Sequence, residues 1–273
     1  MHTVLSQSAV LELAGPDALA FAQAQLMNDV QALDDGAWQW NGWLNPKGRL
    51  VAFFACIRRD AQTLLLWLPA GGAGELATRL QRYVFRSKVR FEPGRWQAVG
   101  SFGDPPQAAG ALCLAMPPDD DGMPRHLLLV PGEAQFPTDP GLAVRWQCAD
   151  LRHGVPYIGP GLPDSEQFVP QWLSLERLQA FSLRKGCYPG QEIVARMHFL
   201  GQSKRAAFLL DGPGDPPPMM TRVRAGDGSI GEIVSSAPAR EGWLALAALV
   251  SAQAEPPLAL EDGRPAALRP LAD

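Results

Sequence analysis

The chain has 273 residues, enough for one large domain or for two to three small ones, each with its own core. Its apolar fraction of 47% and charged fraction of 19% are typical of soluble globular proteins and exclude an intrinsically disordered chain. A net charge of −4 argues against a general nucleic-acid-binding surface.

The N-terminal sequence lacks a basic start followed by an apolar run, so we expect no signal peptide. No stretch approaches the roughly 18 uncharged apolar residues that a membrane helix needs. We therefore expect a cytoplasmic protein without membrane contact. The cysteines are at least 35 residues apart and form no C-x-x-C pair, which argues against a zinc site or a disulfide framework, and we expect no bound metal. They are Cys56, Cys113, Cys148 and Cys187.

The first 102 residues mix strand-like and helix-like patterns. Alternating or β-forming residues predict strands within 9–13, 38–69 and 89–102. Helical spacing of apolar residues covers 18–27 and 71–83, and Pro16 and Asp17 suit the start of the first helix. Asn45–Gly48 carries a turn signal between strands. This mixture indicates an α+β fold and not a doubly wound parallel sheet.

The second half is richer in proline and glycine, which predict loops over 103–106, 117–124 and 137–141, with short apolar strands between them. Residues 211–218 resemble a linker. Short β-rich runs over 230–235, 243–250 and 258–260 then predict a small antiparallel barrel or sandwich. We place a large α+β region at residues 1–200 and a β-barrel domain at 201–273.

The segment Lys185–Glu192, which reads KGCYPGQE, has the composition of a functional loop. Gly186 and Gly190 permit backbone conformations closed to other residues. Pro189 suits the first position of a helix, so Cys187 is expected just before a helix N-terminus and near cations, both of which favour a thiolate over a thiol. Such a thiolate can act as a nucleophile, a redox group or a metal ligand. The alternative is a half-buried structural cysteine, and we favour the functional interpretation; for the other three cysteines we favour a place in the core.

The motif KGCYPGQE, followed by Arg196, resembles the signature of the YgfZ folate-binding proteins, relatives of the glycine-cleavage T-protein (aminomethyltransferase). Further segments resemble family elements in the same order along the chain. They are Gln25–Val30, Asn45–Arg49, Tyr83–Val89, Gly154–Pro156 with Phe168–Gln171, and Gly231–Ser235.

The resemblance implies two interlocked α+β subdomains and a small C-terminal antiparallel β-barrel, arranged as a ring around a folate-binding channel. It implies binding of tetrahydrofolate or a one-carbon derivative, with Trp146 stacking on the ligand. Asn28 and Asp29 could meet a pterin edge. The alternatives are a core tryptophan at a strand end and a helix-end cap. In the cysteine loop, Cys187, Lys185 and Arg196 are the candidate working groups. Tyr188, Gln191 and Glu192 are candidate folate contacts.

The chain also departs from the family pattern. Met27 stands where the family has threonine, Ser8 replaces a tryptophan of some members, and Arg152 replaces a frequent glutamate. The T-protein carries a catalytic aspartate pair where this chain has Val51 and Ala52, so the resemblance does not extend to the T-protein reaction.

Two clusters of basic residues could serve as binding surfaces. One, on an expected helix and strand, could meet RNA but is more often a solvated face. The other flanks the cysteine loop and could hold a folate glutamate tail or an acidic partner. The first cluster is Arg79, Arg82, Arg86, Lys88 and Arg90. The second is Arg184, Lys185, Arg196, Lys204 and Arg205.

Three functions remain open. The resemblance implies a folate-binding accessory protein that assists the assembly, repair or maintenance of iron–sulfur enzymes, including enzymes that thiolate tRNA, through transient contacts with them. A folate-dependent one-carbon transferase with an unidentified acceptor is the alternative. Direct tRNA binding is disfavoured by the acidic net charge.

Overall fold

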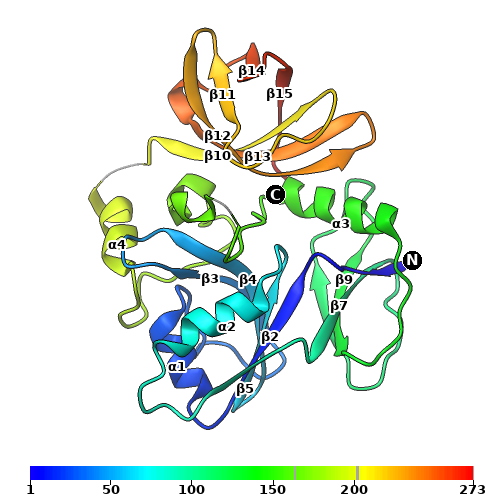
Figure 1. The fold of residues 1–273 in the computed structure, drawn as a ribbon, viewed down its shortest axis with the longest axis vertical. Coiled ribbons are helices and arrows are strands. Elements are labelled where there is room, and N and C mark those ends of the chain that lie inside the picture. The colour runs from blue at the N-terminus through cyan, green and yellow to red at the C-terminus, as the bar shows by residue number, and fades with distance from the viewer. Residues whose placement is uncertain (163, 201–202, 273) are drawn as a thin grey trace.

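The computed structural model describes residues 1–162, 164–200 and 203–272. Two antiparallel sheets and their helices form the lower part of the molecule in Figure 1, and a closed barrel lies above them. The expected α+β class is confirmed, together with the C-terminal barrel, and none of the sheets is a doubly wound parallel sheet.

The first sheet has the strand order β3-β4-β5-β2-β6, and all its strand pairs are antiparallel. Helices α1 (Ala18–Gln25) and α2 (Ala73–Gln81) contribute apolar residues to the cluster on one face of this sheet, and a larger cluster covers the other face. Burial on both faces explains the continuous apolar run Leu64–Leu68. The strands are β2 (Ala9–Ala14), β3 (Trp38–Leu44), β4 (Leu50–Asp60), β5 (Thr63–Leu68) and β6 (Arg90–Pro93).

The predicted turn after β3 is confirmed. Asn45 closes it, because its side-chain Oδ1 accepts hydrogen bonds from the main-chain nitrogens of Lys47 (3.0 Å) and Arg49 (3.1 Å). Gly48 has φ +70° and so supplies the left-handed residue of the turn.

The second sheet has the order β1-β7-β9-β8. Its strands are β1 (His2–Val4), β7 (Trp96–Phe102), β8 (Leu112–Met116) and β9 (Arg125–Pro131). The chain thus starts in the second sheet, builds the first from β2 to β6, and returns to the second, which interlocks the two. One apolar cluster spans both sheets, with Trp40 and Trp67 from the first and Phe102 and Leu127 from the second.

Helix α3 (Pro140–Arg152) is the main element that the sequence analysis missed. The predicted loop over 137–141 is confirmed for 137–139 and wrong for 140–141, and the alternative that placed Trp146 at a strand end was wrong in its element. Pro140 is the first helical residue, and the Asp139 side chain caps the helix by accepting a hydrogen bond from the Leu142 nitrogen at 3.0 Å. In Figure 1, α3 lies directly beneath the barrel.

The barrel closes in the order β10-β13-β12-β11-β14-β15, because β15 pairs back onto β10. Of the linker-like residues 211–218, the first two end β10 and the others belong to the connection from β10 to β11 within the barrel. The predicted domain boundary after residue 200 adjoins residues 201–202, which lie outside the described residues. The strands are β10 (Arg205–Gly212), β11 (Arg222–Ala225), β12 (Gly228–Ala239), β13 (Gly242–Val250), β14 (Leu258–Leu260) and β15 (Pro265–Arg269).

Short 3₁₀ helices at Ser165–Gln167, Pro170–Leu173 and Ser251–Gln253, and helix α4 (Gln191–Leu200), complete the described structure. None of the helices seen in the described residues is both long and apolar enough to span a membrane.

Candidate functional site

The cysteine loop, residues 182–190, leads into α4 and presents one thiol to solvent. Gly186 and Cys187 are exposed, whereas Lys185 and Tyr188 on either side are buried. Ser182 ties the loop together, because its Oγ accepts a hydrogen bond from the Lys185 nitrogen (3.1 Å) and its carbonyl accepts one from the Tyr188 hydroxyl (3.4 Å). Buried residues on both sides therefore hold an exposed cysteine in place.

Lys185 anchors this loop to the end of α1. Its ammonium group donates to the carbonyl oxygens of Gln23 (2.6 Å), Leu26 and Asn28 (3.2 Å). Carbonyl groups at a helix C-terminus lack helical partners and carry partial negative charge, so they suit a cation. Burial lowers the pKa of Lys185 to about 8, and burial likewise raises the pKa of Tyr188 to about 12.

The loop also contacts the turn between β3 and β4. Gly190 has φ +78°, and a Cβ atom there would lie 2.7 Å from the carbonyl oxygen of Asn45. Because Gly190 is left-handed, α4 begins at Gln191, and the expected helix start at Pro189 was wrong. Gly186 differs from the expectation as well, because it has no left-handed φ and open space around it.

The remaining candidate residues of the motif, Gln191, Glu192 and Arg196, lie on α4. Glu192 and Arg196 are exposed, and Gln191 is half-buried. Within residues 1–162, 164–200 and 203–272, no side-chain hydrogen bond or ion pair joins Cys187, Glu192 or Arg196 to another residue. These groups are therefore close together in the sequence, but no contact in the described structure links them into a catalytic network.

The side chain of Asn28 is buried, and both its amide hydrogens form hydrogen bonds within the protein. Its amide nitrogen donates to the carbonyl oxygens of Trp40 (3.0 Å) and Gln179 (2.7 Å), and its Oδ1 accepts from the Asp29 nitrogen (2.9 Å). Asp29 accepts a hydrogen bond from Gln23 at 3.0 Å. Since both amide hydrogens of Asn28 are occupied, a pterin contact through this amide stays a prediction that requires rearrangement.

A cavity of about 510 Å³ opens where the first sheet, α3 and the chain beyond the barrel meet. Its volume is in the usual range for small-molecule sites. It combines an indole, an imidazole, a guanidinium and an amide, groups that suit a ligand with aromatic rings and carboxylates. The lining residues are Trp40, Pro117, His153, Arg177, Leu178, Gln179 and Ala272.

These cavity residues were not among the predicted site residues. Trp40 alone carried a recognisable signal in the sequence, because its strand contains three tryptophans, Trp38, Trp40 and Trp43. In the structure the Trp40 ring stacks on that of Phe53, with 5.2 Å between the ring centroids. Gln179 has φ +49°, a strained conformation for a residue with a side chain. Asn28 connects this cavity to the cysteine loop. Its side-chain amide donates hydrogen bonds to the main-chain carbonyl groups of Trp40 and Gln179 in the cavity lining, and its main-chain carbonyl group accepts one from Lys185.

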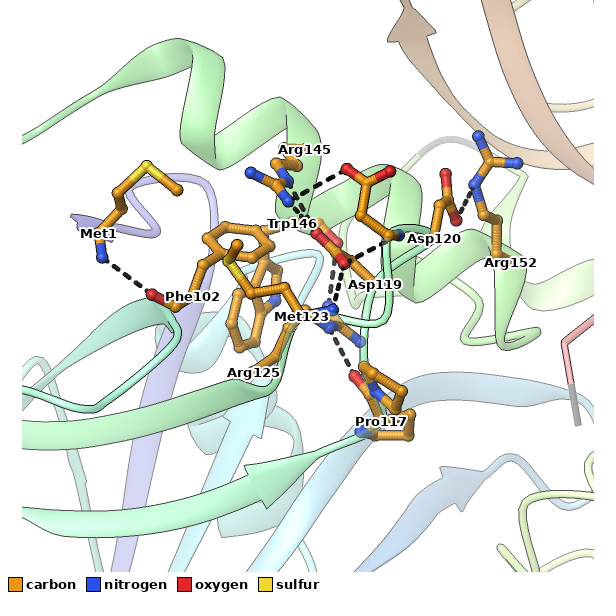
Figure 2. A network of polar contacts seen from close by, with 12 residues as sticks. Met1, Phe102, Pro117, Asp119, Asp120, Met123, Arg125, Arg145, Trp146 and Arg152 are labelled. Atoms are coloured by element: carbon orange, nitrogen blue, oxygen red, sulfur yellow. Dashed lines mark hydrogen bonds and ion pairs between the residues drawn. The ribbon is translucent and has the colours of Figure 1, made fainter.

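Trp146, the predicted stacking residue, lies in the core on α3 with 1% of its surface exposed. The guanidinium of Arg125 lies 4.5 Å from its ring centroid and donates to the Pro117 carbonyl oxygen at 2.7 Å (Figure 2). Arg125 is itself buried and pairs with Asp150 at 2.9 Å. A folate contact of Trp146 therefore stays a prediction, and the observed surroundings are those of a core residue.

The departures from the family pattern have simple structural counterparts. Val51 and Ala52, the residues expected in place of the T-protein aspartates, are buried apolar residues of β4. Met27 is buried in the main core. Arg152 forms an ion pair with Asp120 at 2.5 Å, in the part of the polar network that Figure 2 shows at the right. In the described residues, no group of three or more His, Cys, Asp or Glu side chains could hold a metal ion.

The two basic clusters are partly neutralised. In the first, Arg79 pairs with Glu75 (2.8 Å) and Glu166 (2.5 Å). In the second, Arg205 pairs with Glu232 at 2.5 Å, and Lys185 is buried as described above. Neither cluster is a continuous row of free cations.

No family model matches the chain. A protein of Haemophilus influenzae described as uncharacterized is 32% identical over 207 residues, which cover 75% of this chain and 71% of that protein. The tRNA-modifying protein YgfZ of Klebsiella pneumoniae is 29% identical over 240 residues (78% and 72% covered), and that of Edwardsiella ictaluri 26% over 271 residues (88% and 81%).

Among solved structures, aminomethyltransferase T of the glycine cleavage system from Bartonella henselae superposes with a TM-score of 0.69 over 99% of this chain and 85% of that protein. The sequence identity is 15%, so this likeness concerns the fold. The related sequences show that the chain belongs to the YgfZ family, and the likeness to the solved structure shows that its fold is that of the glycine-cleavage aminomethyltransferase.

Proposed function

We propose that this protein binds a reduced folate in the cavity beside Trp40 and uses the thiol of Cys187 to support the assembly, repair or maintenance of iron–sulfur enzymes, including enzymes that thiolate tRNA. Its relatives named tRNA-modifying proteins support the link to tRNA. The proposal includes a cytoplasmic location and transient contacts with those enzymes.

The observation that carries the proposal is the connection between the thiol and the cavity. Cys187 is exposed on a loop that Lys185 anchors, Lys185 binds the carbonyl group of Asn28, and Asn28 binds Trp40 and Gln179 in the cavity wall. A ligand that shifts the cavity wall would thereby reach the cysteine loop through two buried side chains.

The cellular test compares two exposed cysteines. Cells whose only copy carries Cys187→Ala should lose thiolated tRNA nucleosides and iron–sulfur enzyme activity to the level of the deletion strain. Cells with Cys113→Ala should resemble the wild type, because Cys113 is also exposed but lies on β8, away from the loop. Equal behaviour of the two variants would remove Cys187 from the proposal.

The binding test uses purified protein and 5-formyltetrahydrofolate in equilibrium dialysis. Trp40→Leu should weaken binding about tenfold or more, since an aromatic wall contributes stacking as well as apolar area. Cys187→Ala should bind like the wild type. A Trp40→Leu protein that is folded and binds normally would place the folate elsewhere.

The competing one-carbon transferase reaction is not favoured, because the buried Val51 and Ala52 supply no carboxylate where the T-protein has its catalytic aspartates. Incubation of the purified protein with methylenetetrahydrofolate and ammonia or candidate amine acceptors decides the point. Catalytic turnover of the folate would favour the transferase.

A further inference from the structure

The residues after the barrel return to the candidate folate cavity. Strand β15 ends at Arg269, and the segment Pro270–Ala272 then runs against α3, with Ala272 in the cavity lining. Leu271 packs on the apolar cluster that contains Leu151 and Tyr157. This short segment, which we term the latch, has no strand partner to hold it.

Two hydrogen bonds to the main chain of Ala272 fix the latch. The Ala272 nitrogen donates to the Arg152 carbonyl oxygen at 2.8 Å, and the Ala272 carbonyl oxygen accepts from Nη2 of Arg177 at 2.6 Å. Arg177 lines the same cavity and is exposed, and this bond to a neutral carbonyl group is its sole side-chain hydrogen bond within the described chain. The described chain therefore offers this cation at the cavity a single, neutral acceptor.

A carboxylate is the natural competitor for this guanidinium. A hydrogen bond from a guanidinium is charge-assisted whatever its acceptor, but a carboxylate adds the attraction of a second charge and can accept two such bonds side by side from one arginine. The hydrogen bond between Arg177 and Ala272 is exposed, so water can replace the partner that the Ala272 carbonyl group would lose. The exchange thus favours an anionic ligand at little cost to the protein.

We propose that Arg177 selects cavity ligands that carry a carboxylate and that such a ligand displaces the latch from the cavity wall. The inference rests on the proposed function, since a folate supplies the carboxylates through its glutamate. Linkage requires the reverse effect as well: loosening the latch must strengthen the binding of carboxylate-bearing ligands.

The test measures the dissociation constants of 5-formyltetrahydrofolate and of 5-formyltetrahydropteroate, which lacks the glutamate. The wild type should prefer the folate, and Arg177→Gln should abolish that preference. A variant without residues 271–273 should bind the folate about 2- to 10-fold more tightly than the wild type, the equivalent of one hydrogen bond. Arg222→Gln is the matched control, because Arg222 is exposed on β11 and is absent from the cavity lining.

Hydrogen exchange provides a second readout on the intact chain. Addition of 5-formyltetrahydrofolate should speed exchange of the Ala272 amide, and 5-formyltetrahydropteroate should not. Folate binding with equal preference in the wild type and Arg177→Gln, or with unchanged exchange at Ala272, would overturn the latch and leave the proposed function intact. Absence of folate binding by the wild type contradicts both proposals.

Discussion

The ammonium nitrogen of Lys185 lies 3.2 Å from the carbonyl oxygen of Asn28, a residue 157 positions earlier in the chain. This contact joins the cysteine loop to the residue whose amide fixes the wall of the cavity. A lysine that looks from its sequence like an electrostatic partner of Cys187 is thus a buried anchor of the loop. Its role is positional, and it can be tested by stability as well as by activity.

Replacing Lys185 with methionine should lower the free energy of unfolding by about 2 kcal/mol, because several carbonyl groups lose a charged hydrogen-bond donor. Urea unfolding at pH 7 measures the change. Lys204→Met is the control, since Lys204 is exposed and should alter stability by less than about 0.5 kcal/mol. Equal stability of the wild type and Lys185→Met would mean that the anchor contributes nothing.

The lowered pKa of Lys185 predicts that the stability of the protein depends on pH. Its pKa is about 8 in the folded protein against an ordinary value of 10.5, so between these values the unfolded chain binds more protons than the folded one. The free energy of unfolding contributed by Lys185 should therefore rise with pH across this window, by at most about 1.4 kcal/mol per pH unit.

Unfolding curves at several pH values between 7 and 10.5 check this prediction. The stability difference between the wild type and Lys185→Met should be flat below pH 8 and grow above it. The difference between the wild type and Lys204→Met should stay near zero throughout. A difference for Lys185→Met that shrinks as the pH rises would contradict the assigned environment.

Much of the fold was predictable because its signals are local. The turn at Asn45–Gly48 needs only an asparagine and a glycine at the right spacing, and the strands of the barrel show as short apolar runs between turns. Helix α3 had an equally local signal in Asp139–Pro140, a capping residue followed by proline. It was missed because proline and glycine were interpreted as loop residues.

The candidate site was predictable only in part, since its main contacts are long-range. Trp40 and Arg177 line one cavity although they are 137 positions apart, and no local pattern joins them. The burial of single residues could not be predicted from the motif either. Lys185 and Cys187 are two residues apart, yet Lys185 is buried and Cys187 is exposed. Composition drew attention to the loop but could not tell its buried anchors from its exposed side chains.

The buried ion pair between Arg125 and Asp150 should be essential for stability. Arg125 and Asp150 have no exposed side-chain surface, and Asp150 also accepts a hydrogen bond from the Tyr157 hydroxyl at 2.9 Å. Asp150→Ala leaves the guanidinium buried without its carboxylate, which should cost about 3–5 kcal/mol in urea unfolding. Asp262→Ala, at a surface pair, should cost less than about 1 kcal/mol.

A double variant separates the charge from the packing. Arg125→Met with Asp150→Leu removes both charges and should recover a large part of the loss seen in Asp150→Ala, because no unpaired ion remains buried. If the double variant is as unstable as the single one, the loss comes from packing around Trp146 and not from the stranded charge.

The two glycines of the cysteine loop should respond differently to the same substitution. At Gly190 a methyl group meets the Asn45 carbonyl oxygen at 2.7 Å and the backbone has φ +78°, so Gly190→Ala should lower the free energy of unfolding by at least about 1–2 kcal/mol. At Gly186 no atom lies within 4 Å of the added carbon, so Gly186→Ala should change it by less than about 1 kcal/mol in either direction. Urea unfolding of the two variants provides the comparison. Equal losses would show that the loop does not rest on the turn between β3 and β4 as described, because the contact exists at Gly190 alone.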